Sequence, residues 1–299
     1  MNRVYITDLD DVEEKYLVKL DDEILLNYKY VAKLNAIDNP GITNVNHMIK
    51  LKELNVGYFS GIDDKGIENI NLEKLYVGDY KKITNVNHMT KLRVLDACGL
   101  CGIDNKGIRN NNLEILSASD NPKITNVNHM TNLKKLYAEH NCGIDDVGIK
   151  NINLEELDAF NNYKITNVNH MTNLKILNAS NNCGIDDDGI RNINLVKLHV
   201  LFNHKVTDVN HMTNLKELYA SGEFCGIDDD GIKNINLEIL HASENPGICC
   251  VNHMTNLKEL YAGGKSCGID DDGIKNINLE KLDAYCNPKI SDVKVLYSK

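Results

Sequence analysis

Residues 154–173 read LEELDAFNNYKITNVNHMTN, and this stretch decides the fold because close copies of it fill most of the chain. Each copy contains the string Val-Asn-His-Met, whose histidine recurs at intervals of 41 residues and finally of 42. A second string, Gly-Ile-Asp, recurs between these copies, so each long period holds two shorter repeats. Such self-similarity is typical of chains that stack one small structural element many times. The histidines are His47, His88, His129, His170, His211 and His253.

Aligning the residue that opens each copy gives thirteen repeats, spaced 20 to 22 residues apart, in which we number positions from that residue. The common pattern is L-x-x-L-x-A-x-x-N-x-x-I, as in Leu154, Leu157 and Ala159. This alternation predicts a short strand whose fourth and sixth positions face a core while the third and fifth face solvent. One repeat cannot bury its leucines alone, so the strands must stack as a parallel sheet. The repeats open at Val31, Leu51, Leu72, Leu92, Leu113, Leu133, Leu154, Leu174, Leu195, Leu215, Leu237, Leu257 and Leu279.

The second part of each repeat comes in two kinds. In odd-numbered repeats the apolar residues follow a spacing of three, as in Ile165, Val168 and Met171, which suits a 3-10 or extended turn. In even-numbered repeats the string Gly-Ile-Asp-Asp-Asp-Gly-Ile predicts a short helix with Asp186 or Asp228 as its N-cap. We therefore expect an α/β solenoid with a parallel sheet on its concave face. Short helices and 3-10 or extended turns would cover its convex face.

This pattern resembles the leucine-rich repeat over nearly the whole chain. The helical repeats are similar to the cysteine-containing repeats of F-box and ribonuclease-inhibitor-like proteins, because Cys142, Cys183, Cys225 and Cys267 each precede Gly-Ile-Asp-Asp. The resemblance implies a non-enzymatic scaffold that binds a protein or peptide on its concave face. Near-identical repeats and abundant asparagine also indicate tandem expansion in a protist or in a giant virus of protists.

The ends of the chain depart from the repeat. We assign residues 1–30 to an N-terminal cap whose apolar spacing favours a helix, residues 31–289 to the solenoid, and residues 290–299 to the short end of the last repeat. Residues 20–26, LDDEILL, resemble the opening of an F-box, which implies an alternative function as a substrate-receptor fragment of a ubiquitin ligase. At the other end, an uncovered strand edge at residues 279–284 predicts a homodimer.

The recurring cysteines, histidines and aspartates are residue types that often form catalytic or metal sites. Equivalent residues lie in alternate repeats, about 9 to 10 Å apart, which is too far for a disulfide or a shared metal ion. We interpret the cysteines as buried thiols, the histidines as partners of neighbouring backbone groups, and the aspartates as helix caps on a solvated face. This interpretation predicts no metal, no cofactor and no catalytic residue. The cysteines are Cys101, Cys142, Cys183, Cys225 and Cys267.

Composition restricts the partner and the compartment. The chain has 33 lysines and arginines against 43 aspartates and glutamates, a net charge of −10, which disfavours nucleic acid as a partner. It has no apolar run of about 18 residues that would predict a membrane span. It begins without the basic and apolar regions of a secretory signal. We therefore expect a cytoplasmic protein that binds neither nucleic acid nor membrane.

Selective binding must lie where the repeats differ, which is at positions three and five of the strands. Neighbours in such a row lie about 4.8 Å apart, so the position-five residues from His199 to Asp283 should form one contiguous strip. Tyrosine is common in protein interfaces. The alternative is that these tyrosines are strand formers that pack on each other in a purely structural or decoy array. The candidate residues are Tyr76, Tyr137, His199, Tyr219, His241 and Tyr261 at position five, and Ile115, Ile176 and Ile239 at position three.

Overall fold

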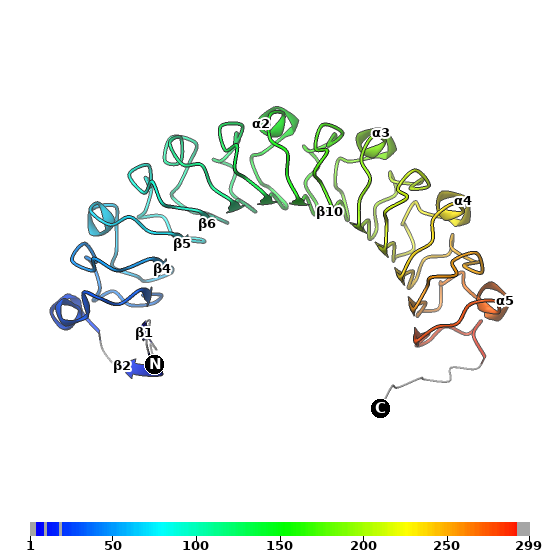
Figure 1. Cartoon of the computed structure of the whole chain (residues 1–299), viewed down its shortest axis with the longest axis horizontal. Coiled ribbons are helices and arrows are strands. Elements are labelled where there is room, and N and C mark those ends of the chain that lie inside the picture. Colours follow the sequence, from blue (N-terminus) through cyan, green and yellow to red (C-terminus); the bar gives the residue numbers. More distant parts are fainter. Residues whose placement is uncertain (1–3, 9–10, 18–19, 292–299) are drawn as a thin grey trace. The chain divides into compact units, whose positions relative to one another are not determined.

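The computed structural model describes residues 4–8, 11–17 and 20–291, and the chain divides into two compact units, Met1–Ile152 and Asn153–Lys299. We call these units the N-terminal half and the C-terminal half, and describe each by itself. In each half the strands of successive repeats line the concave side, and the return segments lie along the convex side (Figure 1).

The N-terminal half contains the strands of repeats 1–6, which pair in parallel and in register. Leu34 lies opposite Leu54, and Leu54 lies opposite Leu75. A shift of one residue would turn these leucines to solvent, so the apolar pattern itself sets the register. The strands are β3 (Lys33–Asn35), β4 (Glu53–Asn55), β5 (Lys74–Tyr76), β6 (Val94–Asp96), β7 (Ile115–Ser117) and β8 (Lys135–Tyr137), and the return segments include η2 (Lys65–Ile67) and α2 (Asp146–Ile149).

Two strands precede the first repeat. β1 (Val4–Asp8) and β2 (Asp11–Leu17) are antiparallel, and β1 also pairs with β3. The helix expected from apolar spacing is therefore wrong for β2, because β1 pairs with the edge of β3 and offers its own other edge to β2. Only α1 (Asp22–Leu25), with Asp21 as N-cap, and η1 (Leu26–Tyr28) are helical among the described residues before repeat 1.

The C-terminal half contains the strands of repeats 7–13, again parallel and in register. With the six strands of the other half, they make thirteen solenoid strands, so the predicted fold class is confirmed. The strands are β9 (Glu156–Asp158), β10 (Ile176–Asn178), β11 (Lys197–His199), β12 (Glu217–Tyr219), β13 (Ile239–His241), β14 (Glu259–Tyr261) and β15 (Lys281–Asp283), and the helices are α3 (Asp187–Ile190), α4 (Asp229–Ile232) and α5 (Asp271–Ile274).

Burial follows the alternation that the sequence predicts. From β4 to β14 the middle residue of each strand is buried, and the two residues beside it are half-buried. In repeat 7, Leu157 and Ala159 are buried from the strand side, while Ile165, Val168 and Met171 are buried from the return segment. Each repeat thus closes a thin apolar core between its two sides, and burial of such side chains drives the stacking.

The predicted short helix forms in repeats 6, 8, 10 and 12 as a single turn with an acidic N-cap, whereas repeat 2 has the 3-10 helix η2 and repeat 4 has turns in its place. In α4, Asp228 accepts a hydrogen bond from the backbone N–H of Gly231 at 3.0 Å, and Asp186 does the same for Gly189 in α3, as predicted. A Cβ atom at Gly231 would lie 2.0 Å from the carbonyl oxygen of Thr207 in the preceding repeat. Glycine is therefore needed here because the helix packs directly against backbone.

Each strand ends in a turn with a left-handed residue at position eight. All thirteen repeats share this backbone, although only three of them have glycine there. The turn sends the chain from the strand into the return segment. The residues are Asp38, Tyr58, Asp79, Gly99, Asp120, His140, Asn161, Asn181, Phe202, Gly222, Glu244, Gly264 and Cys286.

Asparagine and cysteine alternate at the buried side of this turn. In most odd repeats position nine is an asparagine whose amide donates to carbonyls of the preceding repeat, as Asn203 does to Ala179 and Ile185. Repeat 3 has Tyr80 there instead, and its hydroxyl donates to the Ser60 carbonyl at 2.8 Å. In even repeats from repeat 4 on a cysteine takes this place, whereas repeat 2 has the buried Ser60. Cys225, which is half-buried rather than buried as predicted, has its Sγ 3.4 Å from the carbonyl oxygen of Val200. Asparagines at position nine of even repeats are consequently exposed. They are Asn141 and Asn182.

Candidate functional site

Four aromatic rings stack on the concave side of the C-terminal half. His199 on β11, Tyr219 on β12, His241 on β13 and Tyr261 on β14 occupy position five of successive strands. Their ring centroids are 4.0, 4.1 and 3.9 Å apart, and their planes are within 14° of parallel. The parallel register brings the rings to contact distance, as the predicted contiguous strip requires. We call these four residues the ring stack. The last residue of the predicted strip, Asp283, lies opposite Tyr261 and is exposed.

Lysine and glutamate side chains at position three hold both tyrosines of the ring stack. Lys197 Nζ lies 4.8 Å from the Tyr219 ring centroid and 2.8 Å from a carboxylate oxygen of Glu217. Lys281 Nζ lies 4.6 Å from the Tyr261 ring centroid and 2.5 Å from its hydroxyl. That hydroxyl donates to Glu259 at 2.9 Å. The tyrosine rings are therefore fixed by their neighbours at both the ring and the hydroxyl.

The imidazoles of the ring stack are neutral near pH 7. Burial, reinforced by the Lys197 ammonium, lowers the pKa of His199 to about 4. Burial also lowers the pKa of His241, against the opposing effect of the Glu259 carboxylate. Since burial disfavours the charged form of histidine, the ring stack presents uncharged aromatic edges between charged side chains.

The two candidate tyrosines of the N-terminal half have polar neighbours in their rows. Tyr76 lies between Asn55 and Asp96 in the sheet register. Tyr137 lies beside Ser117. Both tyrosines lie at position five, where they are half-buried, and these neighbours are not aromatic rings that could extend a stack.

The three candidate isoleucines are half-buried and do not form one apolar patch. Ile176 lies between Glu156 and Lys197, and Ile239 lies between Glu217 and Glu259. Ile115 has an apolar neighbour on one side, Val94, and Lys135 on the other. Position three is thus mainly charged, and the candidate residues that the structure brings together are the four of the ring stack.

The recurring histidines form bonds within the architecture. His211 Nε2 lies 3.1 Å from the carbonyl oxygen of Ile190, the last residue of α3, and His253 Nε2 lies 3.1 Å from that of Ile232, the last residue of α4. Each imidazole contacts a carbonyl oxygen at the end of a helix, where the helix itself supplies no N–H donor. The interpretation of these histidines as partners of backbone groups is confirmed at both sites.

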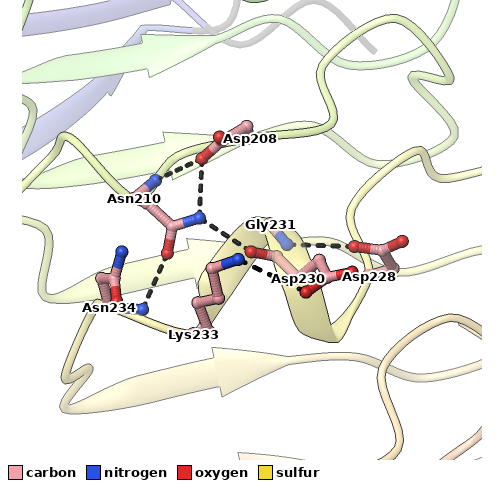
Figure 2. A network of polar contacts seen from close by, with 7 residues as sticks. All are labelled: Asp208, Asn210, Asp228, Asp230, Gly231, Lys233 and Asn234. Carbon is pink, nitrogen blue, oxygen red and sulfur yellow. Dashed lines mark hydrogen bonds and ion pairs between the residues drawn. The ribbon is translucent and has the colours of Figure 1, made fainter.

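Sequence reasoning missed the asparagine that precedes each of these histidines. Figure 2 shows Asn210, whose side-chain nitrogen donates to Asp208 and to the Asp230 carbonyl at 2.8 Å each. Its side-chain oxygen accepts from the backbone N–H of Asn234 at 2.7 Å. Lys233 completes the network with an ion pair to Asp230 at 3.4 Å. The recurrence of asparagine at this place was the available signal, and it marks a clamp onto the next repeat.

The aspartate that follows each N-cap also binds the next repeat. Asp187 accepts from the backbone N–H groups of Thr207 and Asp208 at 2.8 and 3.1 Å, and from the Thr207 hydroxyl at 2.6 Å. Asp229 accepts in the same way from the backbone N–H of Cys249 at 2.8 Å. The recurring aspartates therefore have two roles: the first of each pair caps a helix, and the second joins its repeat to the next one. Across residues 20–291, no three His, Cys, Asp or Glu side chains gather as a metal site would require.

Solved structures share this architecture. An internalin, InlF, of Listeria monocytogenes aligns with a TM-score of 0.60 at 20% sequence identity, over 97% of this chain and 89% of the internalin chain. The chain has the leucine-rich repeat fold. A complex of TLR13 with ssRNA13 also matches the leucine-rich repeat fold of this chain, with a TM-score of 0.50 at 19% identity, over 84% of this chain and 45% of that one. No family model and no curated protein matches the sequence.

None of the helices in the described part of this leucine-rich repeat chain has the length and apolar character needed to cross a membrane.

Proposed function

We propose that this protein is a non-enzymatic scaffold that binds a protein or peptide through the concave face of its strands. The ring stack is the observation that carries the proposal. Four rings from four repeats are held in contact at 3.9 to 4.1 Å, so little side-chain freedom is left to lose on binding. The recurring histidine, aspartate and asparagine side chains are bonded to neighbouring repeats, which leaves the variable concave positions as the selective surface.

A protein partner agrees better with this surface than a nucleic acid does. The matched TLR13 structure is a complex with RNA. In the present chain, however, adjacent rings of the ring stack already touch, so a base cannot enter between them. The net charge of −10 also opposes a polyanion. We extend the proposal to the remaining candidates Tyr76, Tyr137, Ile115, Ile176 and Ile239 as flanking contacts.

We infer a reducing compartment, and hence the cytoplasm, from the cysteines. All nine are free thiols, and four of them are buried among the repeats. Free buried cysteines are usual where thiols are kept reduced. The finer resemblance to F-box and ribonuclease-inhibitor-like repeats, and an origin in a protist or its virus, remain predictions from the sequence. A homodimer through β15 remains part of the proposal.

The concave-face proposal is tested by affinity purification with quantitative mass spectrometry. We expect a variant carrying Tyr137→Ala, Tyr219→Ala and Tyr261→Ala to lose the partners that the wild type retains. Tyr163→Ala, which removes an exposed tyrosine outside the strands, is the matched control and should retain them. Both variants must keep the wild-type circular dichroism spectrum. Recovery of every partner by the triple variant would instead support a purely structural or decoy array, and recovery of an Skp1-like adaptor would support the substrate-receptor alternative.

A further inference from the structure

Phe202 occupies a backbone position that disfavours it. It is the position-eight residue of repeat 9, with a φ of 56°. The left-handed region costs an ordinary L-residue roughly 1–2 kcal/mol, and glycine, asparagine and aspartate tolerate it best. These three types fill position eight in eight of the thirteen repeats. Phenylalanine is one of five residues at this position that the backbone does not favour, so a role for its ring must be argued from its surroundings.

The ring of Phe202 packs against Gly222 in the next repeat. A Cβ atom at Gly222 would lie 2.4 Å from two carbon atoms of this ring. Gly222 is itself the position-eight residue of repeat 10, with a φ of 104°, and its missing side chain leaves room for the ring. Packing on Gly222 positions the phenyl group but does not bury it, because 49% of Phe202 remains exposed.

A second exposed phenyl group follows on the same loop edge. Phe224 lies two residues after Gly222 and is 73% exposed. The two loops are joined, since the backbone N–H of Phe202 donates to the Ser221 carbonyl at 3.1 Å. Tyr58 and Phe59 are likewise exposed on the turn of repeat 2, so what distinguishes the loops of repeats 9 and 10 is two exposed phenyl groups in neighbouring loops joined by a hydrogen bond.

Carboxylates from the neighbouring loops border this apolar site. Glu223 accepts a hydrogen bond from the Ser266 hydroxyl at 2.5 Å, and Glu244 accepts one from the Ser266 backbone N–H at 2.9 Å. Ser266 thus draws two acidic side chains from different repeats toward one place. Lys265 is exposed nearby in sequence, whereas Lys205 is engaged with the Cys183 carbonyl at 3.2 Å. The site therefore combines exposed phenyl rings with a fixed pair of negative charges.

We propose that this loop edge, formed by Phe202, Glu223, Phe224 and Glu244, is a second interaction surface, distinct from the ring stack. Its partner is a protein segment that carries an apolar side chain next to an arginine or lysine. The apolar side chain packs on the two phenyl rings, and the basic one pairs with the two glutamates. The proposal does not depend on the concave-face function.

A displayed library of short random peptides, selected on the immobilised full chain, tests this proposal. We expect the enriched peptides to carry an apolar residue beside arginine or lysine. Their affinity, measured by fluorescence polarisation, should fall at least about tenfold on the F202N and F224S double variant. It should also fall on E223Q with E244Q, and should be unchanged on Y219A with Y261A. Peptides that bind the double phenylalanine variant as tightly as the wild type would overturn the proposal, as would the absence of any enriched peptide.

The stability of F202N separates recognition from packing. Asparagine is found at the equivalent position in Asn161 and Asn181 and suits the left-handed backbone. We expect F202N to unfold at the wild-type temperature or above it. A clearly lower melting temperature would show that the ring is retained to pack on Gly222, and the argument from backbone strain would fail.

Discussion

A single buried asparagine is the least satisfied residue among those that the structure describes. Asn111 is 3% exposed, and its side-chain oxygen has no hydrogen-bond partner. Its side-chain nitrogen donates to the carbonyls of Val86 and Met89 at 3.2 and 3.1 Å. The corresponding residue in repeats 6, 8 and 10 is a buried isoleucine. These are Ile152, Ile193 and Ile235.

We expect Asn111→Ile to raise the free energy of unfolding by about 1 kcal/mol or more, because an unpaired buried polar atom costs roughly 1–3 kcal/mol. Urea unfolding followed by circular dichroism measures this change. The reverse substitution, Ile193→Asn, is the matched control and should lower the free energy of unfolding. A lower urea midpoint for Asn111→Ile would mean that its two amide hydrogen bonds outweigh the unpaired oxygen.

The ring stack should make stability depend on pH. The pKa of His199 in the folded chain is about 4, below the ordinary value of about 6.5. The unfolded chain therefore binds the proton more tightly, and the stabilisation present above pH 6.5 is lost as the pH falls toward 4. We expect His199→Phe, which keeps a ring in the stack, to lessen this loss by roughly 1–2 kcal/mol after allowance for solvent screening. Urea midpoints at neutral pH and near pH 4.5 measure it, and equal losses in variant and wild type would contradict it.

For single residues, the sequence predicted which side chains share a row along the strands better than it predicted what each side chain contacts. The row from His199 to Tyr261 follows from a period of two and a regular spacing, so its contiguity could be predicted. The sequence could not show that Asn141 is exposed while asparagines at the same position of odd repeats are buried, because Cys142, the next residue, takes the buried place. Phe202 gave no signal until the backbone showed a positive φ.

Among the elements, the one-turn helices depend on close backbone contact. We expect Gly231→Ala to lower the free energy of unfolding by about 1–3 kcal/mol, because the added methyl group would meet the Thr207 carbonyl oxygen at 2.0 Å and force α4 away from its neighbour. Asp230→Ala in the same helix is the control, since that side chain is 90% exposed. Thermal unfolding of both variants is the measurement. Equal losses would indicate that α4 adjusts without strain.

The edge strand β15 should pair with a second copy. Among the described residues it pairs with β14 on one side only, and Leu279 and Leu282 are half-buried, whereas the equivalent Leu257 and Leu260 are 2% and 0% exposed. Residues 292–299 lie outside the described residues. We expect light scattering to show a dimer at high micromolar concentration and Leu282→Lys to abolish it. A monomeric wild-type mass at that concentration would refute the pairing.

Element types were predictable where the repeat supplied many copies of one pattern. The N-caps Asp186 and Asp228 were correct because side-chain capping is a local property. β2 was not predictable, since the same apolar spacing suits a helix and a strand, and its pairing with β1, which itself lies along the edge of β3, decides between them.

Over the whole molecule, cysteine reactivity should report the packing of the repeats. Burial raises the pKa of Cys101, Cys183 and Cys225 to about 11, so these thiols remain protonated near neutral pH. We expect a chromogenic disulfide reagent to modify three thiols quickly in the native chain and all nine after unfolding. Two more thiols, those of Cys98 and Cys225, are half-buried, so fast reaction of more than five would show that the repeats open readily in solution. The three exposed cysteines are Cys249, Cys250 and Cys286.

The bonds made by repeat 9 bear on how such a chain can change in length. His211 reaches back to the end of α3, while Asn210 reaches forward to α4, so an odd repeat contributes different side chains to the helical repeats before and after it. Removal of one repeat alone would set two helical repeats, or two non-helical ones, against each other without these contacts. Natural or engineered variation in length should therefore proceed by whole pairs, while the strand residues that face outward from the core stay free to diversify.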